Sequence, residues 1–517
     1  MLFNSYTYLL IFLPLVVSGY YLLLPFHTRW RVIWLALSSL YFYADWSAKY
    51  LPLLLASTLF NFGIGKLLEE KTRCRLFMLR VGVCVNMALL IAFKYTNFIL
   101  AQLNQHLYLA FPQTDIVLPI GISFFTFTQI AYLIDLSRGI CGRYDLWRYV
   151  LFVSFFPHLL AGPILHHKEM MPQFAHRLKI VTYERQIGYG LLIFSIGLYK
   201  KVCLADSVAP FANAAFNAAD GGATLSLASA WWGALAYTLQ LYFDFSGYSD
   251  MAIGSARLFG IRLPLNFNAP YRAANIIEFW RRWHMTLSRF LRDYLYFSLG
   301  GNRLGPVRRY INLMLTMTLG GIWHGAGYGF ALWGLLHGAY LVFNHAWRAL
   351  RCRIPIPKTA LEEFGGCAIT FIAVVIGWVL FRASSFEGAE RMFSAMAGLS
   401  GADSSDVSSA VIAGTNILGN TKLSTLLLSM LNLETITVPS QAVLGSINGV
   451  FLLFPLLGLA TLGPTSQQIV TSIIRAARSN RATKRGLAGC ATVVICVLFL
   501  ISLSQLNHVT EFLYFQF

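Results

Sequence analysis

Long segments without charged residues constrain this chain more than any other feature of its sequence. A helix needs about 20 apolar residues to cross the hydrocarbon core of a bilayer, and apolar segments recur along most of the chain. Only 12% of its 517 residues are charged, whereas soluble proteins carry about a quarter, and 57% are hydrophobic. We therefore predict an all-α polytopic membrane protein that forms a single membrane-embedded domain over residues 1–517.

Roughly a dozen segments are apolar enough to be membrane spans. They are Tyr6–Leu24, Val32–Trp46, Tyr50–Leu67, Leu76–Leu100, Ile116–Leu136, Tyr149–Ile164, Ile187–Leu204, Ala228–Phe245, Ile311–Trp323, Tyr328–Phe343, Cys367–Phe381, Val443–Leu462 and Gly489–Leu503. The first segment has no basic n-region and no A-x-A cleavage site, so we expect a retained helix rather than a signal peptide.

The net charge of +18 is distributed in short basic segments between the apolar ones, such as Lys66–Arg80 and Arg475–Arg485. The positive-inside rule explains this pattern, so no nucleic-acid partner is expected. The same rule predicts that Lys66–Arg80 is cytoplasmic and Met1 periplasmic in a bacterial inner membrane. The segment Ser384–Gln441 is rich in Ser, Ala, Gly and Asn and poor in basic residues, so we predict a large external loop over residues 384–441.

The sequence contains no recognisable metal-binding or nucleotide-binding motif. The eight cysteines form no CxxC pair and the histidines form no HExxH element, so we expect no metal site. There is also no GxSxG elbow and no Walker lysine motif, which argues against a serine hydrolase and against ATP-driven transport.

His324 lies in the most informative apolar segment. No Asp, Glu, Lys or Arg occurs from Ile311 to Phe343, and this stretch is too long for one untilted span. Five glycines from Gly320 to Gly329 weaken helix propagation, so we predict two shorter helices that meet at a break beside His324. An ionisable group at that depth is costly and usually faces a cavity, which makes His324 a candidate for proton transfer. The alternative is a neutral imidazole that bonds a carbonyl freed at the break.

The segment Tyr242–Arg309 is too polar to cross lipid directly and too aromatic to be a solvated loop. We expect re-entrant and cytoplasm-facing helices that pack into the membrane domain. Within it, Trp280, His284 and Ser288 have the spacing of one helical face, which makes His284 a second candidate site residue. The alternative is an amphipathic helix at the membrane interface.

Two carboxylates, Asp244 and Asp250, lie in the sequence DFSGYSD. Together with His324 they would suit the proton relay of a proton-coupled exporter or flippase, which is the rival function from another class. Buried structural ion pairs are the commoner arrangement for such carboxylates. The arginines that we expect as partners in such pairs are Arg257, Arg272 and Arg282.

Three motifs resemble a known family. YTLQLYFDFSGYSDMAIG, NFNAPYRAANIIEFWRRWHMTLSRFLRDYLYFSLGGNR and GGIWHGAGYGFALWGLLHG are similar to the core of the membrane-bound O-acyltransferase family, in the bacterial branch that contains the alginate O-acetylation membrane protein. The likeness is densest between Tyr237 and Gly338. It implies a bundle of tilted helices around a central funnel.

The resemblance also implies an active site. The histidine of the WHG element is His324, which the family uses as its catalytic residue, and the histidine of the FWRRWH element is His284, its partner position. A neutral imidazole suits the deprotonation of an alcohol near pH 7, so we expect His324 to be the general base, with an acyl-histidine as a less favoured variant. His284 would orient His324 or polarise the acyl carbonyl.

The branch further implies acetyl transfer from acetyl-CoA to an exported polysaccharide such as alginate, completed by a periplasmic serine-dependent O-acetyltransferase. Acetyl-CoA is a substrate in this scheme, so no bound cofactor is expected. D-alanyl transfer to a cell-envelope polymer is the alternative within the family. The residues that we assign to donor binding or to support of the site are Arg281, Arg282, Arg289, Asp244, Ser288 and Trp283.

Overall fold

The computed structural model describes residues 1–69, 74–108, 110–142, 144–175, 180–353, 359–400, 441–506 and 512–513. Within these ranges the chain is helical and contains no β-strand, which confirms the predicted fold class. The external loop predicted for residues 384–441 lies mostly outside the described residues. Its described beginning contains α18 (Phe386–Met396).

The first third of the chain forms α1 (Leu13–Leu22), α2 (Thr28–Ser47), α3 (Leu51–Glu69), α4 (Arg75–Lys94), α5 (Thr96–Leu107), α6 (Ile122–Ser137), α7 (Leu146–Ser154), α8 (Phe156–Leu159) and α9 (His167–Ala175). The middle forms α10 (Ile180–Tyr199), α11 (Asp206–Asp220), α12 (Leu227–Leu258), α13 (Ile276–Arg282), α14 (Met285–Phe290), α15 (Gly305–His324), α16 (Tyr328–Arg351) and α17 (Ala360–Arg382). The last part forms α21 (Gln441–Leu462), α22 (Ser466–Ala477) and α23 (Ala482–Ser504).

Five stretches of helix in the described part are long and apolar enough to cross a membrane: Thr28–Glu69, Arg75–Lys94, Glu184–Asp220, Ala360–Arg382 and Ala482–Ser504. Shorter apolar helices cover Thr7–Leu22, Ile122–Ser137 and Leu452–Leu462. The protein is therefore a polytopic membrane protein.

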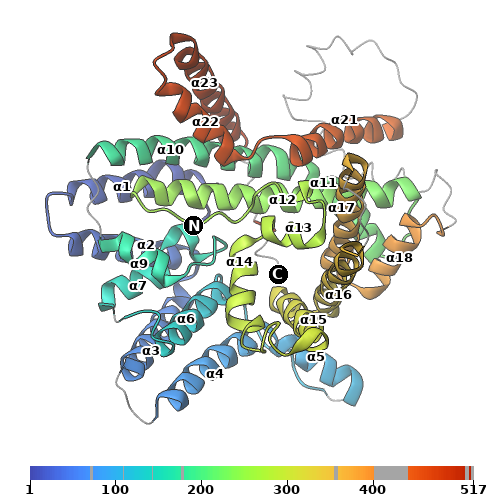
Figure 1. Cartoon of the computed structure of the whole chain (residues 1–517), viewed down its shortest axis with the longest axis horizontal. Helices are drawn as coiled ribbons and strands as arrows, with labels where there is room; N and C mark the ends of the chain where they lie inside the picture. The colour runs from blue at the N-terminus through green and yellow to red at the C-terminus, as the bar shows by residue number, and fades with distance from the viewer. Residues whose placement is uncertain are drawn as a thin grey trace.

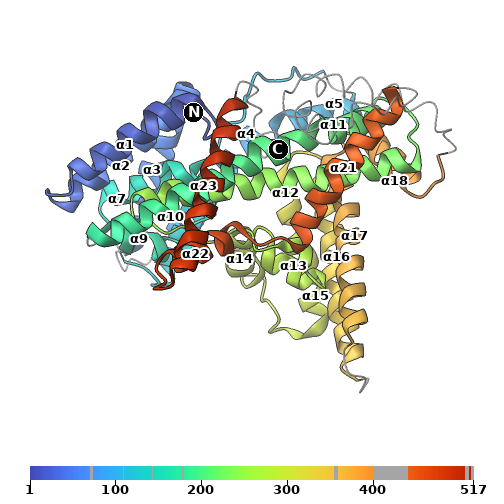
Figure 2. The same cartoon turned by 90° about the horizontal axis from the view of Figure 1, so that it is seen from above.

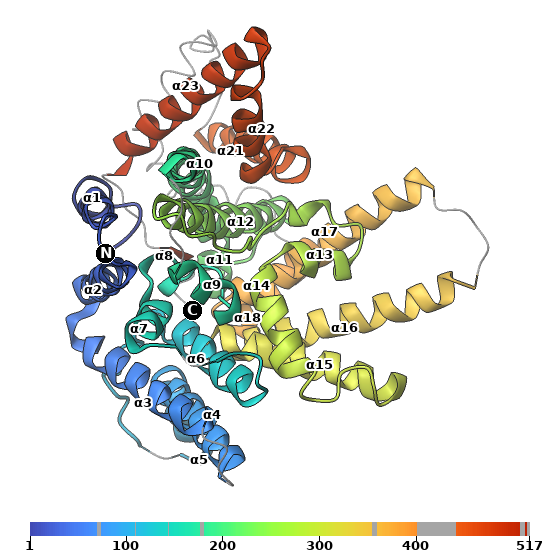
Figure 3. The same cartoon turned by 60° about the vertical axis from the view of Figure 1, so that its left-hand side comes forward.

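The long helix α12 lies at the centre, with α10 beside it (Figure 1). Glycines on both helices allow this close approach: a Cβ atom on Gly247 would lie only 2.7 Å from the carbonyl oxygen of Gly197. The pair α16 and α17 packs side by side and projects away from the layer that contains α10 and α12 (Figure 2 and Figure 3).

Two span predictions are wrong in their extent. The predicted span Ala228–Phe245 does not end at Phe245, because α12 continues as one buried helix to Leu258. The predicted span Tyr149–Ile164 is interrupted at Phe155, two residues before Pro157, which has no N–H to continue the helical ladder.

The predicted span Leu76–Leu100 is confirmed as a long apolar helix only as far as Lys94, where α4 ends, because a separate helix, α5, begins at Thr96. Tyr95 joins the two helices.

Candidate active site

The predicted helix break beside His324 is confirmed. Helix α15 ends at His324, Gly325 has an extended backbone, and α16 begins at Tyr328. A Cβ atom on Gly321 would overlap the backbone carbonyl oxygen of Phe330, so glycine at this position allows α16 to fold back closely against α15.

Aromatic side chains surround His324. Its ring centroid lies 4.9 Å from that of Trp323, 5.3 Å from that of Trp333 and 5.2 Å from that of Phe381. Only 6% of His324 is exposed. The imidazole is therefore enclosed by side chains that contribute no charge, as expected for a group deep in the membrane domain.

The structure brings the second predicted histidine to the first. The ring centroids of His284 and His324 lie 6.4 Å apart, and His284 is 1% exposed. The prediction of one helical face is wrong, however. His284 has a left-handed backbone with φ of 42° and lies at the turn between α13 and α14, so Trp280 and Ser288 belong to different helices.

Backbone pairing holds this turn in place. The N–H of Met285 donates to the carbonyl of Asn266 at 2.9 Å, and the N–H of Asn268 donates to the carbonyl of Arg282 at 2.9 Å. The segment that follows α12 therefore runs beside the turn and supports the unusual conformation of His284.

Asn266 also contacts the imidazole of His284 directly. Its Oδ1 accepts hydrogen bonds from the backbone N–H of Thr286 at 3.4 Å and from the Thr286 hydroxyl at 2.9 Å, which identifies this atom as oxygen. Because an amide oxygen only accepts, Nδ1 of His284, 3.1 Å away, must donate to it. A neutral His284 then has its lone pair on Nε2, which has no hydrogen-bond partner among the described residues.

Sequence reasoning did not single out Asn266, although it lies in the NFNAP motif. The available signal was the pair of polar amides in this motif, Asn266 and Asn268, on either side of Phe267.

The predicted arginines differ in their surroundings. Arg282 forms an ion pair with Glu278 at 2.6 Å, and Arg289 forms a two-pronged pair with Glu169 at 2.5 and 3.0 Å. Arg281 is exposed and forms no ion pair within the described part of the chain. It is therefore the arginine of this group that is most available to an anionic ligand.

The other supporting residues have structural contacts. Trp283 is buried, and its ring centroid lies 4.9 Å from that of Trp378 and 5.7 Å from that of Phe279. The hydroxyl of Ser288 donates to the Trp283 carbonyl at 3.4 Å. These two residues therefore fix the packing around the turn.

The two carboxylates of α12 form buried ion pairs, but with lysines rather than with the predicted arginines. Asp244 lies 2.8 Å from Nζ of Lys201, and Asp250 lies 2.9 Å from Nζ of Lys200. Both lysines follow α10, which the interhelical glycines bring against α12. Neither carboxylate contacts His324. Asp244, which we predicted to bind the donor or support the site, therefore lies outside the histidine pair and pairs with Lys201 instead.

A cavity of about 440 Å³ lies between α10, α12, α22 and α23. Its walls are mainly apolar, and one end is polar where Ser466 and Gln467 donate to Asp250 at 2.6 and 2.7 Å. Asn266 and Phe267 line the cavity and also contact His284, so the cavity adjoins the histidine pair without being lined by either ring.

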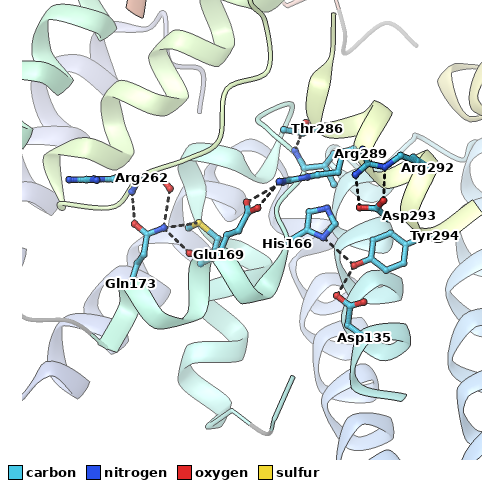
Figure 4. A network of polar contacts seen from close by, with 12 residues as sticks. Asp135, His166, Glu169, Gln173, Arg262, Thr286, Arg289, Arg292, Asp293 and Tyr294 are labelled. Carbon is cyan, nitrogen blue, oxygen red and sulfur yellow. Dashed lines mark hydrogen bonds and ion pairs between the residues drawn. The ribbon is translucent and has the colours of Figure 1, made fainter. Parts of the chain in front are cut away.

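A polar network fixes the segment that follows His284 (Figure 4). The hydroxyl of Tyr294 donates to Asp135 at 2.7 Å and lies 3.2 Å from Nδ1 of His166. The hydroxyl of Thr286 accepts from the N–H of Ile164 at 3.0 Å. The network therefore ties the π-helix Leu291–Tyr296, which follows α14, to α6, and it ties α14 itself to the loop before α9.

No group of three or more His, Cys, Asp or Glu side chains in the described ranges could hold a metal ion. The absence of a metal from the chemistry stays a prediction.

Residues 105–386 match the family model of the membrane-bound O-acyltransferases. The peptidoglycan O-acetyltransferase of Helicobacter pylori is 42% identical over 435 residues, which cover 78% of this chain and 80% of that protein. The probable alginate O-acetylase of Azotobacter vinelandii is 44% identical over 404 residues, covering 77% of this chain and 78% of that protein.

A teichoic acid D-alanyltransferase of Streptococcus thermophilus is more distant, at 28% identity over 290 residues, which cover 51% of this chain and 68% of that protein. The match to the family model spans more than half of the chain and includes both histidines, α12 and the turn between α13 and α14. The chain belongs to the membrane-bound O-acyltransferase family and is an O-acyltransferase.

Proposed function

We propose that this protein transfers acetyl groups from cytoplasmic acetyl-CoA across a bacterial inner membrane, for the O-acetylation of an exported polysaccharide such as alginate. The names of the relatives at 42 to 44% identity support acetyl as the acyl group and a polysaccharide as the acceptor. D-alanyl transfer has weaker support, because the relative of that name is 28% identical.

The observation that carries this proposal is the pair of buried imidazoles with ring centroids 6.4 Å apart, at a glycine-rich break inside the membrane domain. His324 takes the proton of the attacking hydroxyl while the oxygen bonds to the acetyl carbonyl carbon. The tetrahedral intermediate then collapses, the C–S bond breaks, and the imidazolium returns the proton to the CoA sulfur.

The contact with Asn266 favours one of the two roles considered for His284. A neutral His284 donates from Nδ1 to Asn266, so its Nε2 can accept a hydrogen bond but cannot donate one to an acyl carbonyl. We therefore assign His284 to orienting His324 during the reaction, through a hydrogen bond that the free lone pair on its Nε2 accepts once the substrates are bound.

The same proposal assigns the remaining partners. Arg281 meets the phosphates of acetyl-CoA, since it is exposed and forms no ion pair in the described part of the chain. The acetyl group passes to a periplasmic serine-dependent O-acetyltransferase of the same pathway. The N-terminus is periplasmic by the distribution of basic residues.

The proposal is tested in cells by replacing His324 with alanine. We expect His324→Ala to abolish acetylation of the extracellular polysaccharide while the protein level in the membrane stays unchanged. A matched control is His345→Ala, because His345 lies on α16 beside Arg309 and away from the pair. Mass analysis of the secreted glycans measures the outcome, and full acetylation in His324→Ala would show that the assignment is wrong.

A further inference from the structure

The backbone carbonyls at the end of α15 need hydrogen-bond donors, and the residues assigned to catalysis do not supply them. The last carbonyls of a helix have no partner within the helix, and lipid offers no water to bond them. Because Gly325 is extended, the carbonyls of Ile322, Trp323 and His324 need donors from another element.

The junction of α4 and α5 supplies these donors. Nζ of Lys94 donates to the carbonyls of Trp323 and His324, both at 2.6 Å, and the Tyr95 hydroxyl donates to the carbonyl of Ile322. The ammonium also lies 5.9 Å from the ring centroid of Trp323. A cation at a helix C-terminus is favoured by the helix dipole.

Lys94 has no carboxylate within ion-pair distance in the described part of the chain, whereas Lys200 and Lys201 both do. Its charge is therefore stabilised by backbone carbonyls at the catalytic break, one of them the carbonyl of His324 itself.

Helix α5 contacts the other side of the same break. The hydroxyl of Tyr328, the first residue of α16, donates to Gln102 at 2.7 Å. The ring of Phe98 lies 5.4 Å from that of Tyr328. The α4–α5 junction thus holds the end of α15 and the start of α16, with His324 between them.

We propose that Lys94 is a positioning residue for acyl transfer: by bonding the carbonyls of Trp323 and His324, it holds the imidazole of His324 at its working distance from His284. This inference rests on the proposed function of His324. Loss of Lys94 should affect the chemical step, because Lys94 holds the backbone of His324, the general base. It should not affect binding of acetyl-CoA, because Lys94 does not contact Arg281, the proposed donor site.

The test compares Lys94→Met and Lys94→Arg with wild type, using the purified full-length protein in lipid vesicles, acetyl-CoA as the donor and the periplasmic O-acetyltransferase as the source of the acceptor hydroxyl, with release of CoA as the readout. We expect Lys94→Met to lower kcat about 10- to 100-fold, the usual cost of losing a residue that orients a reactive group. KM for acetyl-CoA stays unchanged. Lys94→Arg recovers most of the loss, because a guanidinium can also donate to two carbonyls.

Lys66→Met is the matched control, since Lys66 also lies in the last turn of a membrane helix but contacts Phe62 and not α15. It should keep the wild-type kcat. Wild-type kcat in Lys94→Met, or a loss in Lys94→Arg as large as in Lys94→Met, would overturn the inference.

His324→Ala is measured alongside. If it stays active, the proposed function of His324 fails whatever Lys94 does. If it is inactive while Lys94→Met has wild-type kcat, only the role of Lys94 is wrong.

Discussion

At the scale of single residues, the site depends on hydrogen bonds that occupy Nδ1 of His284 and leave its Nε2 for chemistry. The side-chain oxygen of Asn266 accepts a hydrogen bond from Nδ1 of His284, and the hydroxyl of Thr286 donates to the same oxygen and holds the amide in place. Asn266 thereby fixes the orientation of the His284 ring, and this orientation sets the direction of the lone pair on Nε2. His284 is thus ordered by neighbours that carry no charge, Asn266 and Thr286.

This arrangement predicts that Asn266→Ala lowers kcat about 10- to 100-fold, because His284 loses the acceptor that sets its tautomer. Asn266→Asp keeps acceptor oxygens for His284 and Thr286, so it should retain more activity than the alanine variant. CoA release by the purified protein measures both. An alanine variant as active as wild type would contradict the assigned tautomer.

Arg281 carries the second prediction at this scale. Arg281→Gln should raise KM for acetyl-CoA about 10- to 100-fold, since one charge-assisted hydrogen bond contributes about 1.5–3 kcal/mol, while kcat stays unchanged. Arg308→Gln is the matched control, an exposed arginine in the first turn of α15. Steady-state kinetics distinguish the two variants, and equal KM values for both would exclude Arg281 from donor binding.

Some of these residues could be predicted from the sequence and others could not. His324 was predictable because glycines and the absence of charge mark a helix break in an apolar segment. The position of His284 could not follow from helical spacing, because the chain turns at this residue with φ of 42°. Asn266 and Lys94 act through contacts with distant segments, which periodicity does not reveal.

At the scale of elements, α12 is stabilised by ion pairs rather than by an apolar surface alone. Lys201 contacts both Asp244 at 2.8 Å and Asp206 at 2.7 Å, and all three lie where α10 meets α12. The sequence suggested a break near Tyr242 because carboxylates and glycines interrupt the apolar pattern. The helix continues because lysines neutralise the carboxylates and the glycines serve close packing.

Removal of one partner from a buried ion pair leaves an uncompensated charge, which costs about 3–5 kcal/mol. Lys201→Met should therefore lower the thermal unfolding temperature of the purified protein in detergent strongly. Arg351→Met is the control, because the pair of Arg351 with Glu362 is solvent-accessible at the carboxylate, and such pairs contribute about 0–1 kcal/mol. Equal unfolding temperatures for the two variants would show that the buried pairs do not stabilise α12.

At the scale of the whole molecule, the all-α membrane architecture followed from composition and apolar segment length. Two interruptions of the predicted spans differ in origin. Pro157 separates α7 from α8, and hydropathy alone does not register a proline. The junction at Tyr95 ends α4 so that its last residue, Lys94, reaches the catalytic break, and this contact with a distant segment could not follow from hydropathy.

The arrangement of the carboxylates also separates the two classes of function. Asp244 and Asp250 are each paired with a lysine and lie apart from His324, so the three residues do not form the chain of exchangeable protons that an exporter needs. Family membership and geometry therefore agree on an acyltransferase.

The most direct test of proton transfer by His324 is a single-turnover measurement on the purified full-length protein in lipid vesicles supplied with acetyl-CoA and with the periplasmic O-acetyltransferase that provides the acceptor hydroxyl. The proposed mechanism predicts that wild type cleaves the thioester and releases CoA. It also predicts that His324→Ala binds acetyl-CoA but releases no CoA. Equal CoA release by the two proteins would contradict it, as would transport of polymer or lipid by wild type without thioester cleavage.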